Sequence, residues 1–149
     1  MALDTVEDCI KEGLIEFIPN RRDMEKESRS CLLEADDRLE SAETFFKIKK
    51  FKYAIVAGYD AMEFAARAAL ALKGVKPRMH KCIFLYLEKE FAATRKLDRE
   101  FPGLIMEAFN TSKQAHYIAG RTIAESMTRS FLDRKVNPFV EEMKKLLKT

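Results

Sequence analysis

The chain has 149 residues, of which 47% are hydrophobic and 34% are charged. That length suits one domain whose core needs no disulfide or structural metal, and that composition excludes a disordered chain. Five glycines and four prolines are too few for the frequent tight turns of an all-β sandwich. The net charge of +3, from 27 basic and 24 acidic residues, is too small to identify a nucleic-acid binder.

The cysteines and histidines show no arrangement typical of a metal site. Cys9, Cys31 and Cys82 lie far apart without a C-x-x-C pair, and neither His80 nor His116 has zinc-ligand spacing to them. We therefore expect three inert thiols in a reduced compartment, no metal and no cofactor. The acidic N-terminus lacks the apolar core of a signal peptide, so a cytoplasmic location without a membrane anchor is expected.

Apolar stripes at helical spacing predict two helices before residue 50. The first lies within residues 1–20, with Asp4 and Glu7 as its capping box and Pro19-Asn20 as its end. Its stripe consists of Leu3, Val6, Ile10, Leu14 and Phe17. The second runs from about Arg21 into the Phe45-Phe46 region, and its packing side consists of Cys31 or Leu32, Ala35, Leu39, Ala42 and Phe46.

The segment Phe51–Gly74 is apolar almost all round, which predicts a helix buried on most sides. Asp60, Glu63 and Arg67 interrupt it along one narrow line, and Glu63 stands four residues before Arg67, the favoured orientation for a helical ion pair. These charges would be costly in lipid, so we expect the central helix of a soluble bundle rather than a membrane span. Gly74 is expected to cap its end.

Further helices are predicted after a short connection at Val75–Pro77. A fourth helix includes Met79–Leu87, the polar stretch from Ala92 to Glu100 is expected to be a loop, and Pro102 suits the first turn of a fifth helix. That helix packs through Ile105, Ala108, Ser112, Ala115 and Ala119, and ends near Gly120. After a capping box of Thr122 and Glu125, the last helix carries Met127, Phe131, Val136, Val140, Met143 and Leu147, with Asn137-Pro138 expected to kink or split it.

Helices joined by short links favour an antiparallel up-and-down bundle. The sequence therefore predicts an all-α fold of five to six helices. It forms one domain over residues 1–149, in which residues 1–20 are an added N-terminal helix. No repeat, low-complexity tract or domain linker is visible.

The central helix and its surroundings resemble HEPN domains, the higher-eukaryote and prokaryote nucleotide-binding helical domains. The resemblance rests on YAIVAGYDAMEFAARAALALKG from Tyr53 to Gly74, followed by PRMHK from Pro77 to Lys81. Members of the family pair an Ala-rich central helix and a glycine stop with a histidine-bearing helix. Ala115-His116-Tyr117 is similar to an element of the family's later helix, and the similarity runs from about Cys31 to the C-terminus.

The resemblance implies a homodimer, and many relatives work beside small nucleotidyltransferases in toxin–antitoxin pairs. Nuclease members cleave RNA without metal, using an arginine followed four to six intervening residues later by a histidine. This chain departs from that motif at both histidines. The permitted positions hold Phe109, Asn110 and Thr111 before His116, and Lys73, Gly74 and Val75 before His80.

His116 is the catalytic candidate, as a carrier of protons. Asn110, Lys113 and Tyr117 share a line along the predicted helix beside it, so they are candidates for hydrogen bonding and phosphate binding. The alternative is a solvated helix border at which His116 packs beside Phe109. Without the family arginine, that alternative is favoured.

Arg78, His80 and Lys81 form a second candidate set for anion binding, because they gather positive charge where a helix begins. The alternative is that His80 caps or packs the preceding loop. Asp60, Glu63 and Arg67 are read as a structural ion pair with a neighbouring acid, or else as a ligand site.

The sequence thus leaves three functions open. The favoured one is an interaction or regulatory module, homodimeric and partnered with a nucleotidyltransferase. A metal-independent ribonuclease that uses His116 comes second. A nucleotide- or RNA-binding bundle without chemistry comes third, and salt-dependent RNA binding would distinguish it from the first.

Overall fold

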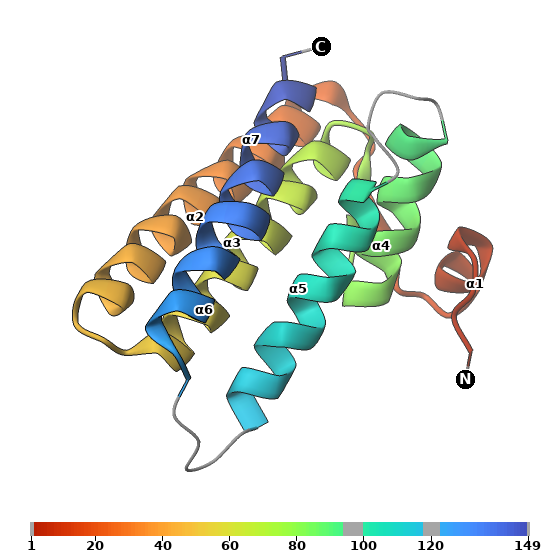
Figure 1. The fold of residues 1–149 in the computed structure, drawn as a ribbon. Coiled ribbons are helices and arrows are strands. Elements are labelled where there is room, and N and C mark those ends of the chain that lie inside the picture. The colour runs from red at the N-terminus through yellow and green to blue at the C-terminus, as the bar shows by residue number, and fades with distance from the viewer. Residues whose placement is uncertain (1, 94–99, 118–122, 149) are drawn as a thin grey trace.

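The protein is an all-α bundle, as predicted, in a computed structural model that describes residues 2–93, 100–117 and 123–148 (Figure 1). The helices are α1 (Val6–Lys11), α2 (Arg21–Lys47), α3 (Phe51–Ala71), α4 (His80–Leu87), α5 (Glu100–Tyr117), α6 (Glu125–Phe131) and α7 (Asn137–Leu146). Two short strands, β1 (Ile15–Phe17) and β2 (Val75–Pro77), lie outside the bundle, and π-helical turns occupy Glu88–Ala92 and Leu132–Val136.

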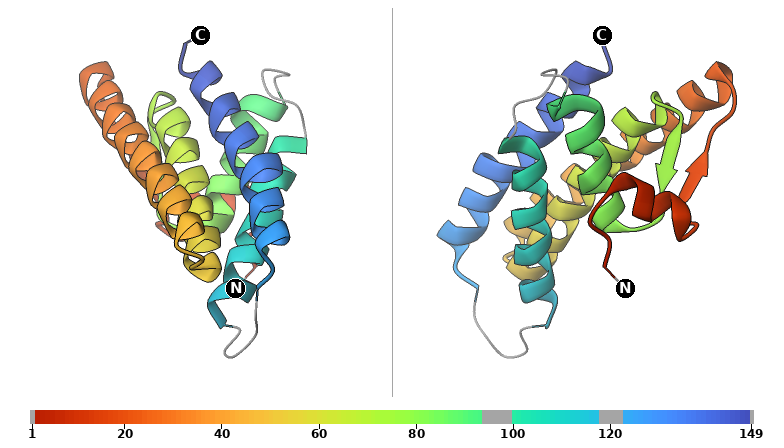
Figure 2. Two further views of the ribbon diagram at one scale, coloured as in Figure 1. Left: turned by 60° about the vertical axis from the view of Figure 1, so that its left-hand side comes forward. Right: turned by 90° about the vertical axis from the view of Figure 1, so that its right-hand side faces the viewer.

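The long helices α2 and α3 form an antiparallel hairpin whose contact surface is made of small side chains (Figure 2). Ala35 and Ala42 of α2 are buried, and α3 supplies a series of buried alanines. Small residues let two helix axes approach closely. The Ser28 hydroxyl can therefore reach across and donate to the Ala68 carbonyl at 2.8 Å, where it is fully enclosed.

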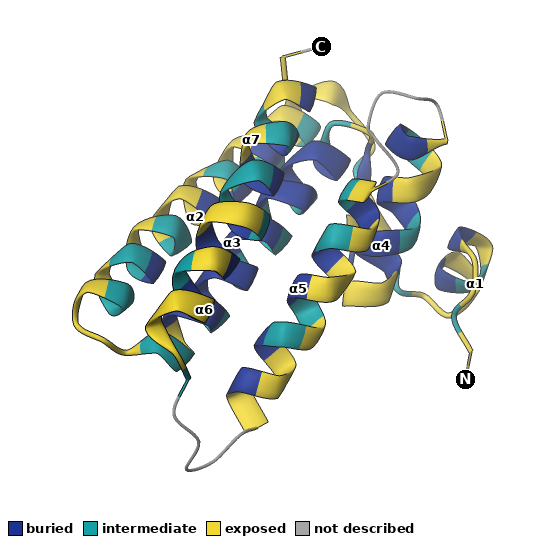
Figure 3. Cartoon of the chain, viewed as in Figure 1, coloured by how far each residue is buried: buried dark blue, intermediate teal, exposed yellow. Residues whose placement is uncertain are grey.

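Helix α3 is the buried centre of the fold, which confirms the prediction from its apolarity. It contacts α2, α4, α5, α6 and α7, and Figure 3 shows it mostly as buried residues. Its buried positions are Ala54, Ile55, Ala57, Gly58, Tyr59, Ala61, Met62, Ala65, Ala66, Ala68, Ala69, Leu70 and Ala71. The residues left partly exposed include the charged line that the sequence singled out.

The helix predicted at the N-terminus is confirmed only for Val6–Lys11. Its capping box is formed by Thr5 and Asp8, rather than by Asp4 and Glu7. Gly13 adopts a positive φ of 71°, a conformation that favours glycine, and the chain then extends as β1. This strand pairs antiparallel with β2, with Ile15 opposite Pro77.

A disulfide joins Cys9 of α1 to Cys82 of α4, so the prediction of three free thiols is wrong for these two. The Cα atoms lie 6.0 Å apart, and both residues are fully buried. Packing α1 on α4 brings together two cysteines that are 73 residues apart in sequence. Cys31 is free and buried, and desolvation raises the pKa of its thiol to about 12.

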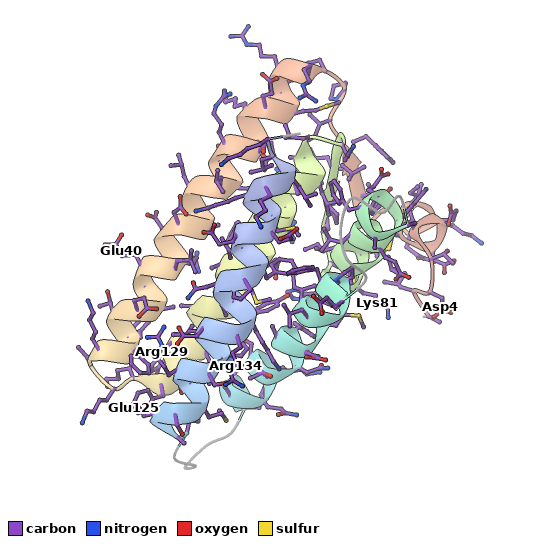
Figure 4. The ribbon with its side chains drawn as sticks, turned by 45° about the horizontal axis from the view of Figure 1, so that its top comes forward. Asp4, Glu40, Lys81, Glu125, Arg129 and Arg134 are labelled. Atoms are coloured by element: carbon purple, nitrogen blue, oxygen red, sulfur yellow. A yellow bond between two sulfur atoms is a disulfide. The ribbon has the colours of Figure 1, made fainter. Side chains whose placement is uncertain are left out.

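Arg129 ties α6 to the C-terminal half of α2. Its two terminal nitrogens donate to the Glu43 carboxylate at 2.9 and 2.7 Å, while its guanidinium lies over the Phe46 ring, 4.6 Å from the centroid. Figure 4 shows this side chain at the α6 end of the bundle. The paired guanidinium lowers the pKa of the Glu43 carboxyl.

The sequence predicts a kink or split at Asn137-Pro138; the chain stays helical from Glu125 to Leu146, and the π turn Leu132–Val136 interrupts the α-helix just before Asn137. Helix α7 begins at Asn137 with Pro138 in its first turn, where a missing N–H is tolerated. The preceding π turn also has a packing reason. Buried residues recur every four positions at Thr128, Leu132 and Val136, a longer interval than the 3.6 residues of an α-helical turn. A wider turn keeps all of them on the core side.

Several predicted features cannot be compared with the structure. Most of the 92–100 loop, together with Ala119, Gly120 and Thr122, lies outside the described residues. Within the described ranges, no helix is both long and apolar enough to cross a membrane.

Two glycine substitutions should change stability in opposite directions. In Gly58→Ala, the new Cβ would lie 2.8 Å from the buried Leu132 side chain and 3.1 Å from Val136. We expect this clash to outweigh the helix propensity of alanine and to lower the free energy of unfolding by roughly 1 kcal/mol. In Gly103→Ala, the new Cβ would meet nothing within 4 Å, so this change should raise the free energy of unfolding by about 0.5–1 kcal/mol. Urea denaturation measures both, and a stabilised Gly58→Ala protein would contradict the packing described here.

Removing the Cys9–Cys82 disulfide should destabilise the fold. The bond closes a loop of 73 residues, for which chain entropy gives about 4 kcal/mol, and native disulfides typically contribute roughly 2–4 kcal/mol. Under oxidising conditions, we expect the free energy of unfolding of Cys9→Ser, measured by urea denaturation, to be roughly 2–4 kcal/mol lower than that of the unmodified protein. Reductant should destabilise the unmodified protein and leave the variant unchanged. If reductant destabilised both proteins equally, its effect would not come from the Cys9–Cys82 disulfide, and this prediction would be wrong.

Candidate functional site

The most organised polar cluster of the described chain surrounds His80, where β2 leads into α4. The Nδ1 atom of His80 lies 2.8 Å from a Glu63 carboxylate oxygen and 3.1 Å from the Tyr59 hydroxyl. Because a carboxylate can only accept, Nδ1 carries a proton in this contact. The His80 side chain is 46% exposed, so the imidazole connects a half-buried acid to the surface.

Arg67 holds Glu63 in place one helical turn away. Its Nη2 and Nε atoms donate to one Glu63 oxygen at 2.9 and 3.2 Å, which confirms the predicted helical ion pair. The remaining Nη1 donates to the Pro77 carbonyl. Arg67 therefore connects α3 to the strand that precedes His80, and its guanidinium is largely used within the protein.

Aromatic rings from three helices pack around the cluster. The imidazole of His80 lies on the Phe109 ring with centroids 4.6 Å apart and planes inclined by 35°. Tyr59 of α3 and Phe84 of α4 also contact Phe109, at 5.6 and 6.0 Å between centroids. These contacts restrict the ring of His80, so that Glu63 and Phe109 together fix its orientation.

Asp60 does not join the cluster directly but turns towards α2. Its carboxylate lies 3.2 Å from Arg38 Nη1, and the Arg38 guanidinium also lies 5.5 Å from the Phe64 ring centroid. Desolvation raises the pKa of Asp60, and the nearby Arg38 opposes that shift. Of the three charged residues in the predicted line, Asp60 therefore pairs with a residue of α2. Glu63 instead pairs with Arg67 of its own helix and with His80 of α4.

The strip that contains His116 lies apart from His80. Asn110, Lys113, His116 and Tyr117 are all exposed on α5, and Tyr117 is 74% exposed. The imidazole of His116 contacts only the edge of the Tyr117 ring in the described contacts, at 5.2 Å between centroids. It does not pack beside Phe109, which instead contacts His80. Seven residues of helix, roughly 10 Å, separate those two positions.

Arg78 and Lys81 flank His80 and are exposed. The backbone N–H of Arg78 donates to the Leu14 carbonyl at 2.8 Å, which secures the N-terminal arm against β2. Lys81 lines a surface hollow of about 320 Å³ with Phe84 and Met106, and it is labelled in Figure 4. Arg78 and Lys81 thus stand beside His80 along the chain, whereas no described contact joins His116 to His80, and Asn110 alone of the α5 strip directly follows Phe109.

Tyr59 is the residue that sequence reasoning missed. Tyr59, Glu63 and Arg67 follow at intervals of four along α3, which places them on one side of the helix. That line could have been noticed from the sequence, but its contact with His80 depends on how α4 crosses α3. In the described residues, no group of three or more His, Cys, Asp or Glu side chains is placed to hold a metal ion.

Tyr59 should make stability sensitive to alkaline pH. Burial, followed by the nearby Glu63 carboxylate, raises the pKa of its phenol above the ordinary value of 10.0. The folded protein therefore keeps a proton that the unfolded chain loses, so its stabilising effect is complete below pH 10 and falls as pH rises above that value. In urea denaturation across this range, Tyr59→Phe should weaken the alkaline fall, whereas the exposed-ring control Tyr117→Phe should retain it. An unchanged fall in Tyr59→Phe would assign it to other groups, such as Tyr86, whose pKa is also raised by burial.

Comparison with known proteins agrees with this architecture. The model of the HEPN domain matches residues 28–148, which is most of the chain. Two similar proteins come from Methanocaldococcus jannaschii. One is named "Putative toxin MJ0142" and is 28% identical over 85% of this chain and 83% of its own length. The other, "Putative toxin MJ0605", is 22% identical over 85% of this chain and 93% of its own. The chain belongs to the HEPN domain family.

Proposed function

We propose that this protein is the toxin-type HEPN subunit of a two-protein, toxin–antitoxin-like pair. In this proposal it is a cytoplasmic homodimer of single-domain chains that acts by binding partners rather than by efficient RNA cleavage. The observation that carries the proposal is the internal use of Arg67. Its donors are directed at Glu63 and at the Pro77 carbonyl, close to the one histidine that has a fixed orientation.

Metal-free RNA cleavage requires both a proton carrier and a group that stabilises charge on the phosphorane. Each positioned group typically contributes on the order of a hundredfold or more. His80 has an oriented ring, but Arg67 approaches it only through Glu63. His116 is exposed and the side chain before it on the same strip, Lys113, is equally exposed. Within one chain, neither histidine therefore combines proton transfer with a contacting group that stabilises charge on the phosphorane.

The proposed partner is a small nucleotidyltransferase, which follows from the family resemblance. The names of the two Methanocaldococcus proteins support the toxin part of the proposal. A binding role also agrees with the large apolar side chains that the surface exposes. These include Met79, Met106, Tyr117 and Met127 on or next to α4, α5 and α6.

A ribonuclease remains the second candidate, and the structure favours His80 over His116 for it. The Glu63 carboxylate orients the ring through Nδ1 and leaves Nε2 free to exchange a proton at the surface. Arg78 and Lys81 lie beside it in sequence and could attract a phosphate. In this reading the Asn110, Lys113, His116 and Tyr117 strip would at most bind RNA.

The deciding experiment is incubation of the purified protein with mixed single-stranded RNAs in the presence of a chelator. We expect no efficient cleavage by the unmodified protein, by His116→Ala or by His80→Ala. The physical reason is that, in the described contacts, neither histidine is paired with an arginine or lysine that could stabilise charge on the phosphorane. Gel analysis of the RNA at several times measures the outcome, and binding at two salt concentrations is recorded in parallel.

Other outcomes would change the assignment in distinct ways. Robust cleavage that disappears in His80→Ala would replace the proposal with a nuclease centred on the Glu63–His80 pair. Loss in His116→Ala would instead identify the α5 strip as catalytic. Tight RNA binding that weakens steeply with salt, without cleavage, would favour a nucleic-acid-binding bundle.

A further inference from the structure

Helix α2 carries a stripe of unpaired charges along the side that faces away from the bundle. The stripe consists of Arg22, Lys26, Arg29, Leu33, Asp37 and Glu40. All six residues are exposed, and on a helix of 3.6 residues per turn they share one face. The buried residues Ser28, Cys31, Ala35 and Ala42 lie on the opposite face. In Figure 4 the labelled Glu40 points away from the rest of the molecule.

The charges on this stripe are separated by sign about Leu33. Lys26 and Arg29 lie seven and four residues before Leu33, and Asp37 and Glu40 lie four and seven residues after it. These two positive and two negative positions are therefore mirror-spaced, whereas Arg22 has no acidic counterpart, since Thr44 stands eleven residues after Leu33. Leu33, at the centre, is 68% exposed, which makes it an isolated apolar side chain between the two charged halves.

The charges beside the stripe are paired within the chain, whereas those on it are not. Glu34 lies 3.6 Å from Arg38, and Asp36 lies 2.9 Å from Lys144. Within the described residues, Lys26, Arg29, Asp37 and Glu40 take part in no ion pair of their own chain. These four charged side chains are thus available to pair with charges of another molecule.

We propose that two copies of the chain pair antiparallel along this stripe, with Leu33 at the two-fold axis. The proposal rests on the homodimer proposed above and assigns its interface. A two-fold axis through Leu33 places Lys26 opposite Glu40 of the second copy, and Arg29 opposite its Asp37. Symmetry repeats each pair, so the charges form four pairs around a Leu33–Leu33 contact.

Charge complementarity selects this partner and this orientation. A second copy is complementary because each half of the stripe matches the other half in spacing and is opposite in sign. A parallel arrangement would set like charges against each other and is disfavoured. The stripe from Arg22 to Glu40 extends about 27 Å, the length of a small interface. The exposed ring of Phe17, which lines a surface hollow with Lys26 and Ser30, adds apolar area at one end.

The test uses two charge-reversed proteins. Lys26→Glu with Arg29→Glu makes all four pairing positions acidic and leaves Arg22 unchanged, and Asp37→Lys with Glu40→Lys makes all four basic. Either protein alone should dimerise at least about tenfold more weakly than the unmodified chain, because like charges then meet across the axis. An equimolar mixture should form the mixed dimer. Sedimentation equilibrium at low and high salt measures the dissociation constants, and native mass spectrometry identifies the mixed dimer.

Matched controls separate this effect from altered folding or altered net charge. Lys11→Glu with Lys148→Glu makes the same change of charge at exposed positions outside the stripe and should leave the dimer intact. Thermal unfolding of all variants checks that the bundle is preserved. Leu33→Asp should weaken the dimer as well, because it buries like charges at the axis.

The outcomes distinguish the interface from the dimer itself. If both reversed proteins dimerise as tightly as the unmodified chain, the α2 interface is wrong and the homodimer itself stands. An unmodified chain that is monomeric at micromolar concentration would overturn the homodimer too. A monomer that binds a nucleotidyltransferase partner, and loses it on charge reversal, would assign the stripe to that partner and contradict the pairing proposed here.

Discussion

The structure depends on the close approach of α2 and α3. Alanines at the contact remove the side-chain volume that normally keeps helices apart, so that a serine of one helix reaches a backbone carbonyl of the other. Such contact gains dispersion energy and excludes water over a long surface. It also requires α3 to be apolar on nearly every side, since α5, α6 and α7 cover the rest of it.

This constraint explains where the polar cluster lies. On a helix that is surrounded on most sides, ionisable groups remain stable only along the narrow line that neighbours can satisfy. Glu63 meets that condition through Arg67 and His80, whereas Asp60 meets it through Arg38. The same contacts fix the start of α4, because Arg67 also binds the carbonyl of Pro77. The fixed geometry of Glu63, Arg67 and His80 thus results partly from helix packing, independently of any chemistry at His80.

Local patterns in the sequence were sufficient for the helices of the bundle but not for the N-terminal arm. Apolar spacing identified α2 to α5 and the break before Pro138, because each depends on residues near in sequence. The strand at Ile15–Phe17 was missed because Leu14 and Phe17 also fit a helical stripe. Its true partner, Val75–Pro77, lies far along the chain, and the partner of Cys9 lies 73 residues after it. Cysteine connectivity cannot be read from spacing alone.

The candidate site was less predictable than the fold for a related reason. The sequence indicated a charged line on α3 and a histidine at the start of α4, but it could not show that they meet. That contact is set by the crossing of two helices and by Phe109 from a third. On α5, periodicity could place Asn110, Lys113 and His116 on one strip, yet it could not tell whether another helix covers that strip.

The π turn between α6 and α7 makes this part of the chain tolerant of a change in the number of its residues. The turn contains one residue more than an α-helical turn and so absorbs the four-residue spacing of the buried side chains. Deleting a single residue from Leu132–Val136 would let the helix close as a regular α-helix, and because the π turn holds one residue more than an α-helical turn, the residues beyond it would face nearly the same way as before. Phe139, Val140 and Met143 would then keep their buried positions. Relatives of this protein can therefore differ by one residue in the length of this segment and still bury the same side chains of α7.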